Sequence, residues 1–189
     1  RAIEDHFDSS FELETRLAKA GKKEFLAIVQ QVIPKGINCA YIRQPDMLGL
    51  GHAVLCAKPL INNEPFAVLL ADDLIDNDKK PCLKQMVEVF NDTHSSVVAV
   101  QEIPNEESHR YGVVSLSKQT ERLGKIDRIV EKPASAEAPS NLGVVGRYIL
   151  TPAILNCLEK TAADKGGEIQ LTDAIEKLLS LESVYSWQF

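Results

Sequence analysis

One uninterrupted apolar run that ends in carboxylates constrains this chain more than any other feature. Residues 65–76 read Pro-Phe-Ala-Val-Leu-Leu-Ala-Asp-Asp-Leu-Ile-Asp. An apolar run without alternation is typical of a strand covered on both faces, as in the parallel sheet of an α/β domain. Ligands of such sheets bind beyond the carboxyl ends of the strands, where Asp72 could hold Mg²⁺ against a phosphate. The same residues also fit a strand followed by an ordinary polar turn, so other parts of the chain must decide.

Composition excludes several classes of partner. The chain has 189 residues, of which 44% are hydrophobic and 25% charged, with a net charge of −6. This length and balance fit a soluble protein with one domain that has a real core, or one domain with appendages. The negative charge gives no general attraction to nucleic acid or anionic membrane, and no apolar stretch approaches the length of a membrane span. We therefore expect neither as a partner, and an anionic substrate would need a local cation or a metal.

The cysteines predict a reducing compartment. Cys39, Cys56, Cys82 and Cys157 are widely scattered and form no CxxC pair. They are typical of reduced core thiols in a cytoplasmic protein, although sequence leaves pairing open. The four histidines show no metal-ligand spacing.

Apolar periodicity predicts alternating helices and strands. Strands are predicted at 38–43, 66–71, 96–103, 111–116, 125–131, 141–150 and 184–189. Helices are predicted near 10–20, over 25–32, from His52, from Pro81, from Thr151 and over 171–179, with a solvated turn at 77–80. This alternation indicates an α/β domain with a largely parallel sheet, partly antiparallel where the strands follow each other closely. No linker divides the chain, so we expect a single domain over 1–189.

Four loops at predicted strand ends carry polar side chains that suit a nucleotide joined to a sugar phosphate. They contain Gln44, Asp72, Gly112 and the pair Glu131 and Lys132. Gln44 can form two hydrogen bonds with a base edge, Glu131 can accept from sugar hydroxyls, and Lys132 can neutralise a phosphate. Each also has a plain structural reading, as a solvated turn residue or a surface ion-pair partner.

Glycines mark the loop that follows Gln44. Gly49 and Gly51 bracket the expected start of a helix near His52. Glycines there let backbone amides approach a ligand, and a helix start favours anions. A simple turn at the start of a helix explains the same residues.

At this point the sequence resembles a known family. Its motifs appear in family order over nearly the whole chain: Arg1-Ala-Ile-Glu-Asp-His-Phe-Asp, Arg43-Gln44, Gly49-Leu-Gly-His-Ala-Val, Tyr111-Gly-Val-Val, Val130-Glu-Lys-Pro, Ala138-Pro-Ser-Asn-Leu, Gly146-Arg-Tyr and Glu168-Ile-Gln-Leu-Thr-Asp-Ala-Ile. Together they resemble the bacterial UTP–glucose-1-phosphate uridylyltransferases, the UDP-glucose pyrophosphorylases of the sugar nucleotidyltransferase superfamily. The resemblance implies a Rossmann-like three-layer fold with a mixed, mostly parallel sheet. It also implies Mg²⁺-dependent formation of UDP-glucose and pyrophosphate from UTP and glucose 1-phosphate.

The resemblance also implies roles for individual residues. On the nucleotide side, Gln44 and Gly51 would contact uracil, and Asp72 would bind the Mg²⁺ that bridges the phosphates. It implies no role for Asp73 or Asp76.

On the sugar side, the resemblance implies that Gly112, Glu131 and the backbone near Val144 hold glucose. Lys132 would grip the sugar phosphate, because a mobile point charge can follow the phosphate as its charge redistributes. Asp173 is expected to be structural.

The chain departs from the family pattern at both ends. It begins without Met and ends at Phe189 in a predicted strand, so we expect a truncated catalytic domain. The family's glycine-rich loop, which cradles the triphosphate, should precede Arg1, and a late segment should follow Phe189. We therefore expect little turnover from these residues alone. An open sheet edge beside 66–71 should favour a homo-oligomer.

Two alternatives remain open. The first is a related enzyme for another nucleotide or sugar, such as a dTTP-using thymidylyltransferase, since a few pocket contacts decide such selectivity. The second is a non-catalytic regulatory paralogue, against which Asp72, Glu131 and Lys132 argue.

Overall fold

The computed structural model describes residues 2–76 and 79–189, so Asn77 and Asp78 of the expected solvated turn lie outside the described residues. The chain divides into two compact units, Arg1–Arg43 and Gln44–Phe189. A single catalytic domain over the whole chain stays a prediction.

The first unit consists of helices joined by irregular segments. Its helices are α1 (Ala2–Phe7), α2 (Phe11–Lys19) and α3 (Lys23–Gln30). Ser10 is the N-cap of α2, so the helix begins where the sequence predicts. The strand predicted over 38–43 is wrong, because these residues are exposed and irregular. A short apolar run forms a strand only beside a partner strand, and the described part of this unit provides none.

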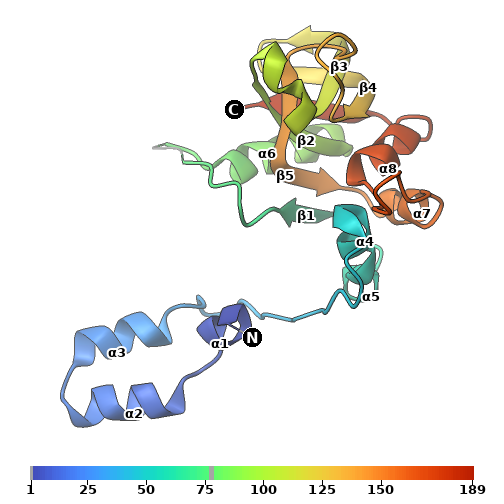
Figure 1. Cartoon of the computed structure of the whole chain (residues 1–189). Coiled ribbons are helices and arrows are strands. Elements are labelled where there is room, and N and C mark those ends of the chain that lie inside the picture. Colours follow the sequence, from blue (N-terminus) through green and yellow to red (C-terminus); the bar gives the residue numbers. More distant parts are fainter. Residues whose placement is uncertain (1, 77–78) are drawn as a thin grey trace. The chain divides into compact units, whose positions relative to one another are not determined.

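The second unit is built on one six-stranded sheet (Figure 1). Its strands are β1 (Phe66–Leu69), β2 (Ser96–Glu102), β3 (Gly112–Thr120), β4 (Leu123–Glu131), β5 (Leu142–Leu150) and β6 (Val184–Gln188). Its helices are α4 (Gly49–Cys56), α5 (Lys58–Ile61), α6 (Cys82–Thr93), the 3-10 helix η1 (Asn105–Arg110), α7 (Ala153–Glu159) and α8 (Leu171–Leu178). The strands lie in the order β1-β5-β2-β6-β4-β3, with a further pairing of β5 with β3.

The sheet is mixed, as expected, but the expectation of a mostly parallel sheet is wrong. Among the described strands, β2 and β6 form the one parallel pair. The apolar runs β1 and β2 do share a direction, as two strands joined through α6 should. However, β5 lies between them and pairs antiparallel with both, which sequence spacing does not reveal.

Helices cover both faces of the sheet and complete three layers. On one face, α4, α7 and α8 bury side chains such as Val54, Leu158 and Ile175 against β2, β4 and β5. On the other face, α6 buries Met86 and Val89 against β2 and β5. No described helix is long and apolar enough to cross a membrane.

The strand β1 lies at the end of the sheet rather than inside it. Its burial alternates along the strand: Phe66 and Val68 pack against the core beneath α4, whereas Ala67 is exposed and Leu69 is 52% exposed. The prediction that both faces of this run are covered is therefore wrong. Within the described residues the run has a neighbouring strand on one side only, β5.

Candidate functional site

A cleft of about 440 Å³ collects most of the residues singled out from the sequence. Asp72 reaches it from the turn after β1, and Glu131 and Lys132 from the end of β4. Gly112 at the start of β3 and Val144 in β5 complete the set. These residues come from four separate segments, so the fold brings together the aspartate and the lysine on one cleft, as the sequence analysis requires.

The end of β4 forms a charged corner of the cleft. The Thr172 hydroxyl donates to Glu131 Oε2 at 2.8 Å, and Lys132 Nζ lies 3.4 Å from Glu131 Oε1. The Glu131 side chain is 22% exposed and that of Lys132 is 54% exposed. Each carboxylate oxygen therefore has a different partner, and the lysine keeps its access to solvent.

The backbone also shapes this corner. Lys132 has φ +43°, a left-handed conformation that is uncommon for residues other than glycine. Its N–H donates to Tyr111 O at 2.9 Å, which closes the β3–β4 ladder. The chain therefore turns out of the strand at Lys132, immediately beside Glu131.

Gly112 allows α8 to approach the floor of the cleft closely. Gly112 pairs with Glu131 across the ladder, and a Cβ atom at Gly112 would lie 2.7 Å from the Thr172 methyl group. A side chain there would push α8 away from Glu131. The glycine is thus required by packing as well as by any ligand.

Asp72 lies on a turn that is fixed by the neighbouring strand. Asp73 Oδ2 accepts the Gly146 N–H at 2.7 Å, so this second carboxylate is used inside the protein. The Arg147 guanidinium donates to Leu70 O at 3.0 Å and to Asp73 O at 2.5 Å. Asp72 itself is exposed and lines the cleft.

The segment before α8 forms another wall, which contains Glu168 and Gln170. Asp164 organises it by accepting the N–H groups of Gly166 at 2.8 Å and Glu168 at 3.0 Å, and the Gln170 side-chain amide at 2.8 Å. These hydrogen bonds, that from Gln170 first, lower the pKa of Asp164. A charged Asp164 therefore holds this wall in place.

Tyr148 adds a phenol to the cleft. It is 5% exposed, and burial raises its pKa, with smaller contributions from the negative charges of Glu131 and Asp73. The phenol consequently keeps its proton and can donate a hydrogen bond within the cleft.

The two predicted uracil contacts lie beside this cleft rather than in its lining. The Gly51 N–H donates to Ile169 O at 2.8 Å, and a Cβ on Gly51 would lie 2.6 Å from the same oxygen. The Gln44 amide donates to Gly49 O at 3.0 Å and lies 3.1 Å from His52 Nδ1. The structure thus gives Gly51 a packing role, and the uracil contacts stay predictions.

Sequence reasoning missed three residues that the structure adds to the site or its support. They are Thr172, Arg147 and Tyr148, all within motifs quoted for the resemblance. Their contacts cross between segments 41 to 77 residues apart. No local periodicity could have revealed those contacts.

The carboxylates of the cleft suit a cation that is coordinated mostly by substrate phosphates and waters and by few protein groups. The described residues contain no group of three His, Cys, Asp or Glu able to hold one metal together. Asp73, Glu131 and Glu168 are already hydrogen-bonded, which leaves Asp72 as the carboxylate best placed to meet a cation. Mg²⁺ is commonly held by one or two carboxylates together with substrate phosphates and waters.

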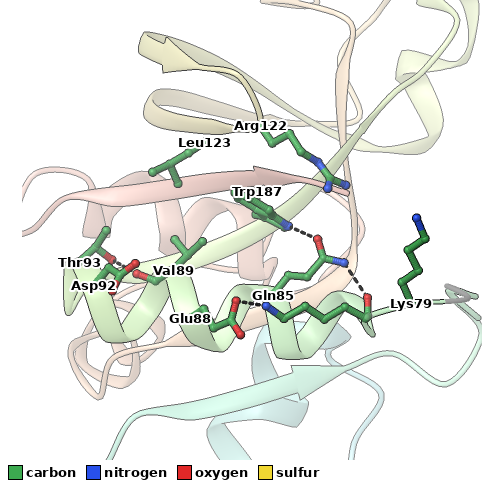
Figure 2. Close-up of a pocket in the computed structure, with 10 residues that line it drawn as sticks. Lys79, Gln85, Glu88, Val89, Asp92, Thr93, Arg122, Leu123 and Trp187 are labelled. Atoms are coloured by element: carbon green, nitrogen blue, oxygen red, sulfur yellow. Dashed lines mark hydrogen bonds and ion pairs between the residues drawn. The ribbon is translucent and has the colours of Figure 1, made fainter.

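A second cavity, of about 550 Å³, lies between α6 and the β3–β4 turn (Figure 2). Its polar groups contact one another: Trp187 Nε1 donates to Gln85 Oε1 at 3.1 Å, and Gln85 Nε2 donates to Lys80 O at 2.7 Å. Lys80 also forms an ion pair with Glu88. Because these groups bind each other, we assign the functional site to the smaller cleft.

Comparisons with known proteins show the family to which this chain belongs. The family model described as nucleotidyl transferase matches residues 8–188. A Staphylococcus epidermidis UTP–glucose-1-phosphate uridylyltransferase is 47% identical over the whole chain, which spans 65% of that relative's length. A structure of UDP-glucose pyrophosphorylase complexed with UDP-glucose is 40% identical with a TM-score of 0.88, over 100% of this chain and 69% of that one. A UTP-bound enzyme from Acinetobacter baumannii is 38% identical with a TM-score of 0.90, over 100% and 65%.

Proposed function

This chain belongs to the nucleotidyl transferase family, and from that membership we propose that it forms UDP-glucose and pyrophosphate from UTP and glucose 1-phosphate. The observation that carries the proposal is the shared cleft of Asp72, Glu131 and Lys132. Relatives with this named activity align with the whole chain. The chain spans just under two thirds of the first relative's length, so the activity is proposed for the protein of which these residues are part.

The reaction is an in-line phosphoryl transfer. An oxygen of the sugar phosphate attacks the α-phosphorus of UTP, a new P–O bond forms, and the bond to the β-phosphate breaks to release pyrophosphate. The protein need form no covalent bond with the substrates, so catalysis depends on positioning them and on neutralising their charge. In the cleft, the fixed carboxylate of Glu131 would position the sugar, and the half-exposed ammonium group of Lys132 would neutralise charge.

Glu131 serves the sugar in this proposal. Thr172 holds one carboxylate oxygen, which fixes the rotamer, and the carboxylate can then accept hydrogen bonds from two neighbouring sugar hydroxyls. Gly112 has no side chain to obstruct the ring, and the backbone near Val144 is the third proposed contact with glucose. Together these residues would orient the phosphate of the sugar toward Lys132.

Lys132 serves the phosphate. Its ammonium group lies at the rim of the cleft with half of the side chain exposed, and its ion pair with Glu131 is long at 3.4 Å. An exposed ion pair of this kind contributes roughly 0–1 kcal/mol, so little energy opposes the move of Lys132 to a phosphate. The charge could then follow the transferring group.

Asp72 is the proposed ligand of Mg²⁺. Bound there, Mg²⁺ would neutralise phosphate charge in the transition state. The turn between β1 and the following segment presents the carboxylate, and Asp73 and Arg147 hold that turn. Gln44 and Gly51 remain the proposed uracil contacts.

Two further features of the protein belong to the proposal. All four cysteines are free thiols, which supports a cytoplasmic location. The exposed edge of β1 supports a homo-oligomer.

The test is release of pyrophosphate by the full-length protein from UTP, glucose 1-phosphate and Mg²⁺. We expect turnover that is lost with EDTA and restored by Mg²⁺. Replacing UTP by dTTP, with all else equal, separates a uridylyltransferase from a thymidylyltransferase. Binding of UDP-glucose without turnover would instead identify a regulatory paralogue.

A further inference from the structure

We propose that Arg147 is a positioning residue for metal binding, which fixes the turn that presents Asp72 to the cleft. This inference rests on the proposed function, because it assumes a divalent cation at Asp72. It concerns a residue to which neither the sequence analysis nor the comparisons give a role.

The first argument is the position of Arg147 at the end of the β1–β5 ladder. Leu69 pairs with Arg147, and Leu70 N–H donates to Gly146 O at 2.9 Å. Beyond Leu70 the chain leaves the strand, and the backbone of Asp72 and Asp73 has no strand partner among the described residues. Something other than the sheet must therefore hold the turn.

Hydrogen bonds from the Arg147 side chain hold the turn in place of backbone hydrogen bonds to a neighbouring strand. One guanidinium nitrogen donates to Leu70 O at 3.0 Å and to Gly146 O at 2.7 Å, and the other donates to Asp73 O at 2.5 Å. The planar guanidinium thus joins the carbonyl oxygens on either side of Asp72 and leaves the Asp72 carboxylate uncovered. A lysine has no such fork and could satisfy one or two of these oxygens.

Asp73 locks the same turn from its own side. Its carboxylate accepts the Gly146 N–H at 2.7 Å, and a Cβ on Gly146 would lie 2.5 Å from that carboxylate oxygen and 2.6 Å from Leu70 Cβ. The turn therefore lies directly on the bare backbone of β5. Gly146 has no side chain that would clash with the turn, the Asp73 carboxylate binds the Gly146 N–H, and the Arg147 side chain binds carbonyl oxygens on both sides of Asp72.

These contacts explain why only one of two adjacent carboxylates meets the cation. The Asp73 carboxylate is hydrogen-bonded to the Gly146 N–H inside the protein, whereas Asp72 lines the cleft. Groups that orient a metal ligand commonly change metal affinity about 10–100-fold when removed, although they never touch the metal. Arg147 has the same relation to Asp72.

The experiment measures Mn²⁺ binding by the full-length protein, by electron paramagnetic resonance of free Mn²⁺, with and without saturating UDP-glucose. For Arg147→Gln we expect a Kd for Mn²⁺ about tenfold higher, as for other groups that support a metal ligand. Arg147→Lys should lie between this variant and the wild type. The matched control is Arg122→Gln. Arg122 lines the other cavity, shown in Figure 2, and its Nε also donates to a backbone carbonyl, Gln188 O, at 2.6 Å. That control should leave the Kd unchanged.

A second pair of variants keeps the test decisive if Arg147→Gln does not fold. Asp73→Asn retains an oxygen that can accept the Gly146 N–H, whereas Asp73→Ala does not. We expect near-normal Mn²⁺ binding in the first and weaker binding in the second, with faster hydrogen exchange at the Gly146 amide. Equal Mn²⁺ affinity in wild type and a folded Arg147→Gln would overturn the inference, and if Arg147→Gln does not fold, equal affinity in wild type and Asp73→Ala would do so.

The outcomes separate this inference from the proposed function. A wild-type protein that turns over substrate, with an Mn²⁺ affinity indifferent to Arg147, refutes only the positioning role. A wild-type protein that binds Mn²⁺ through this turn but neither binds UDP-glucose nor turns over UTP refutes only the activity. A Kd for Mn²⁺ about tenfold higher in Arg147→Gln than in the wild type supports the inference in either case.

Discussion

The most informative residues lie side by side at the end of β4. Glu131 and Lys132 carry opposite charges, yet their ion pair is long at 3.4 Å: Thr172 holds one carboxylate oxygen, Lys132 Nζ lies near the other, and the ammonium stays half-exposed. If the Glu131 carboxylate and the Lys132 ammonium formed a close ion pair, neither group would be available to bind its ligand. The hydroxyl of Thr172 therefore matters because it holds the Glu131 carboxylate independently of Lys132.

Replacing Lys132 tests the phosphate role. In the full-length protein, Lys132→Ala should lower kcat/KM by at least about 100-fold, because it removes a charge that acts at the transferring phosphate. The control is Lys84→Ala on α6, an exposed lysine remote from the cleft lining. A near-normal kcat/KM for Lys132→Ala would end this assignment.

Thr172 can be tested with variants of matched shape. Thr172→Val keeps the volume beside Gly112 but removes the donor to Glu131, and Thr172→Ser keeps the donor. A hydrogen bond to a charged group contributes about 1.5–3 kcal/mol, so Val should raise the KM for glucose 1-phosphate at least about tenfold. The KM for UTP should not change, and Ser should restore most of the loss. Equal effects of Val and Ser would mean that packing alone is at stake.

At this scale the sequence placed Asp72 and Lys132 at one site, but it did not predict which contacts hold the site together. Asp72 and Lys132 were assigned to one site from family motifs, and the cleft contains both. Arg147 and Thr172 were missed because the groups that they bind, in the turn after β1 and at the end of β4, lie far away along the chain. Gly51 was assigned to a ligand, whereas the structure shows its N–H used by Ile169 O.

At the scale of elements, the wall before α8 depends on one ionised side chain. Asp164 accepts hydrogen bonds from Gly166, Glu168 and Gln170, and these lower its pKa. A group with a lowered folded-state pKa stabilises the fold above its unfolded pKa of about 3.9. That stabilisation is lost as the pH falls through the lower folded-state value. The wall should therefore loosen in acid before the core does.

Thermal unfolding and amide exchange across pH check this wall. At pH 7, Asp164→Asn should lower Tm and speed hydrogen exchange at the Gly166 and Glu168 amides, because the charge that holds them is gone. The difference from wild type should shrink below about pH 4, where the unfolded-state aspartate binds a proton. A difference in Tm that stays constant from pH 7 to pH 3 would contradict this account.

At the scale of the whole second unit, the order of elements could be predicted from sequence, but the direction of the strands could not. Apolar periodicity located all six strands of the sheet and the helices α6, α7 and α8, since each buries an apolar side. Strand order depends on contacts between distant segments. The insertion of β5 between β1 and β2 turned an expected parallel core into antiparallel pairs.

The last prediction concerns the open side of β1. An exposed strand edge with apolar side chains can pair with another chain, and a lysine on such an edge opposes pairing. We expect the 189-residue chain to self-associate with rising concentration, and Ala67→Lys, in the middle of its edge strand, to shift it toward monomer. The matched control is Leu181→Lys, since Leu181 is 68% exposed but lies in the turn after α8. Sedimentation velocity over a hundredfold range of concentration measures the shift. Identical sedimentation of wild type and Ala67→Lys would place any oligomer contact elsewhere, because pairing through β1 would bring the introduced charge into the new ladder.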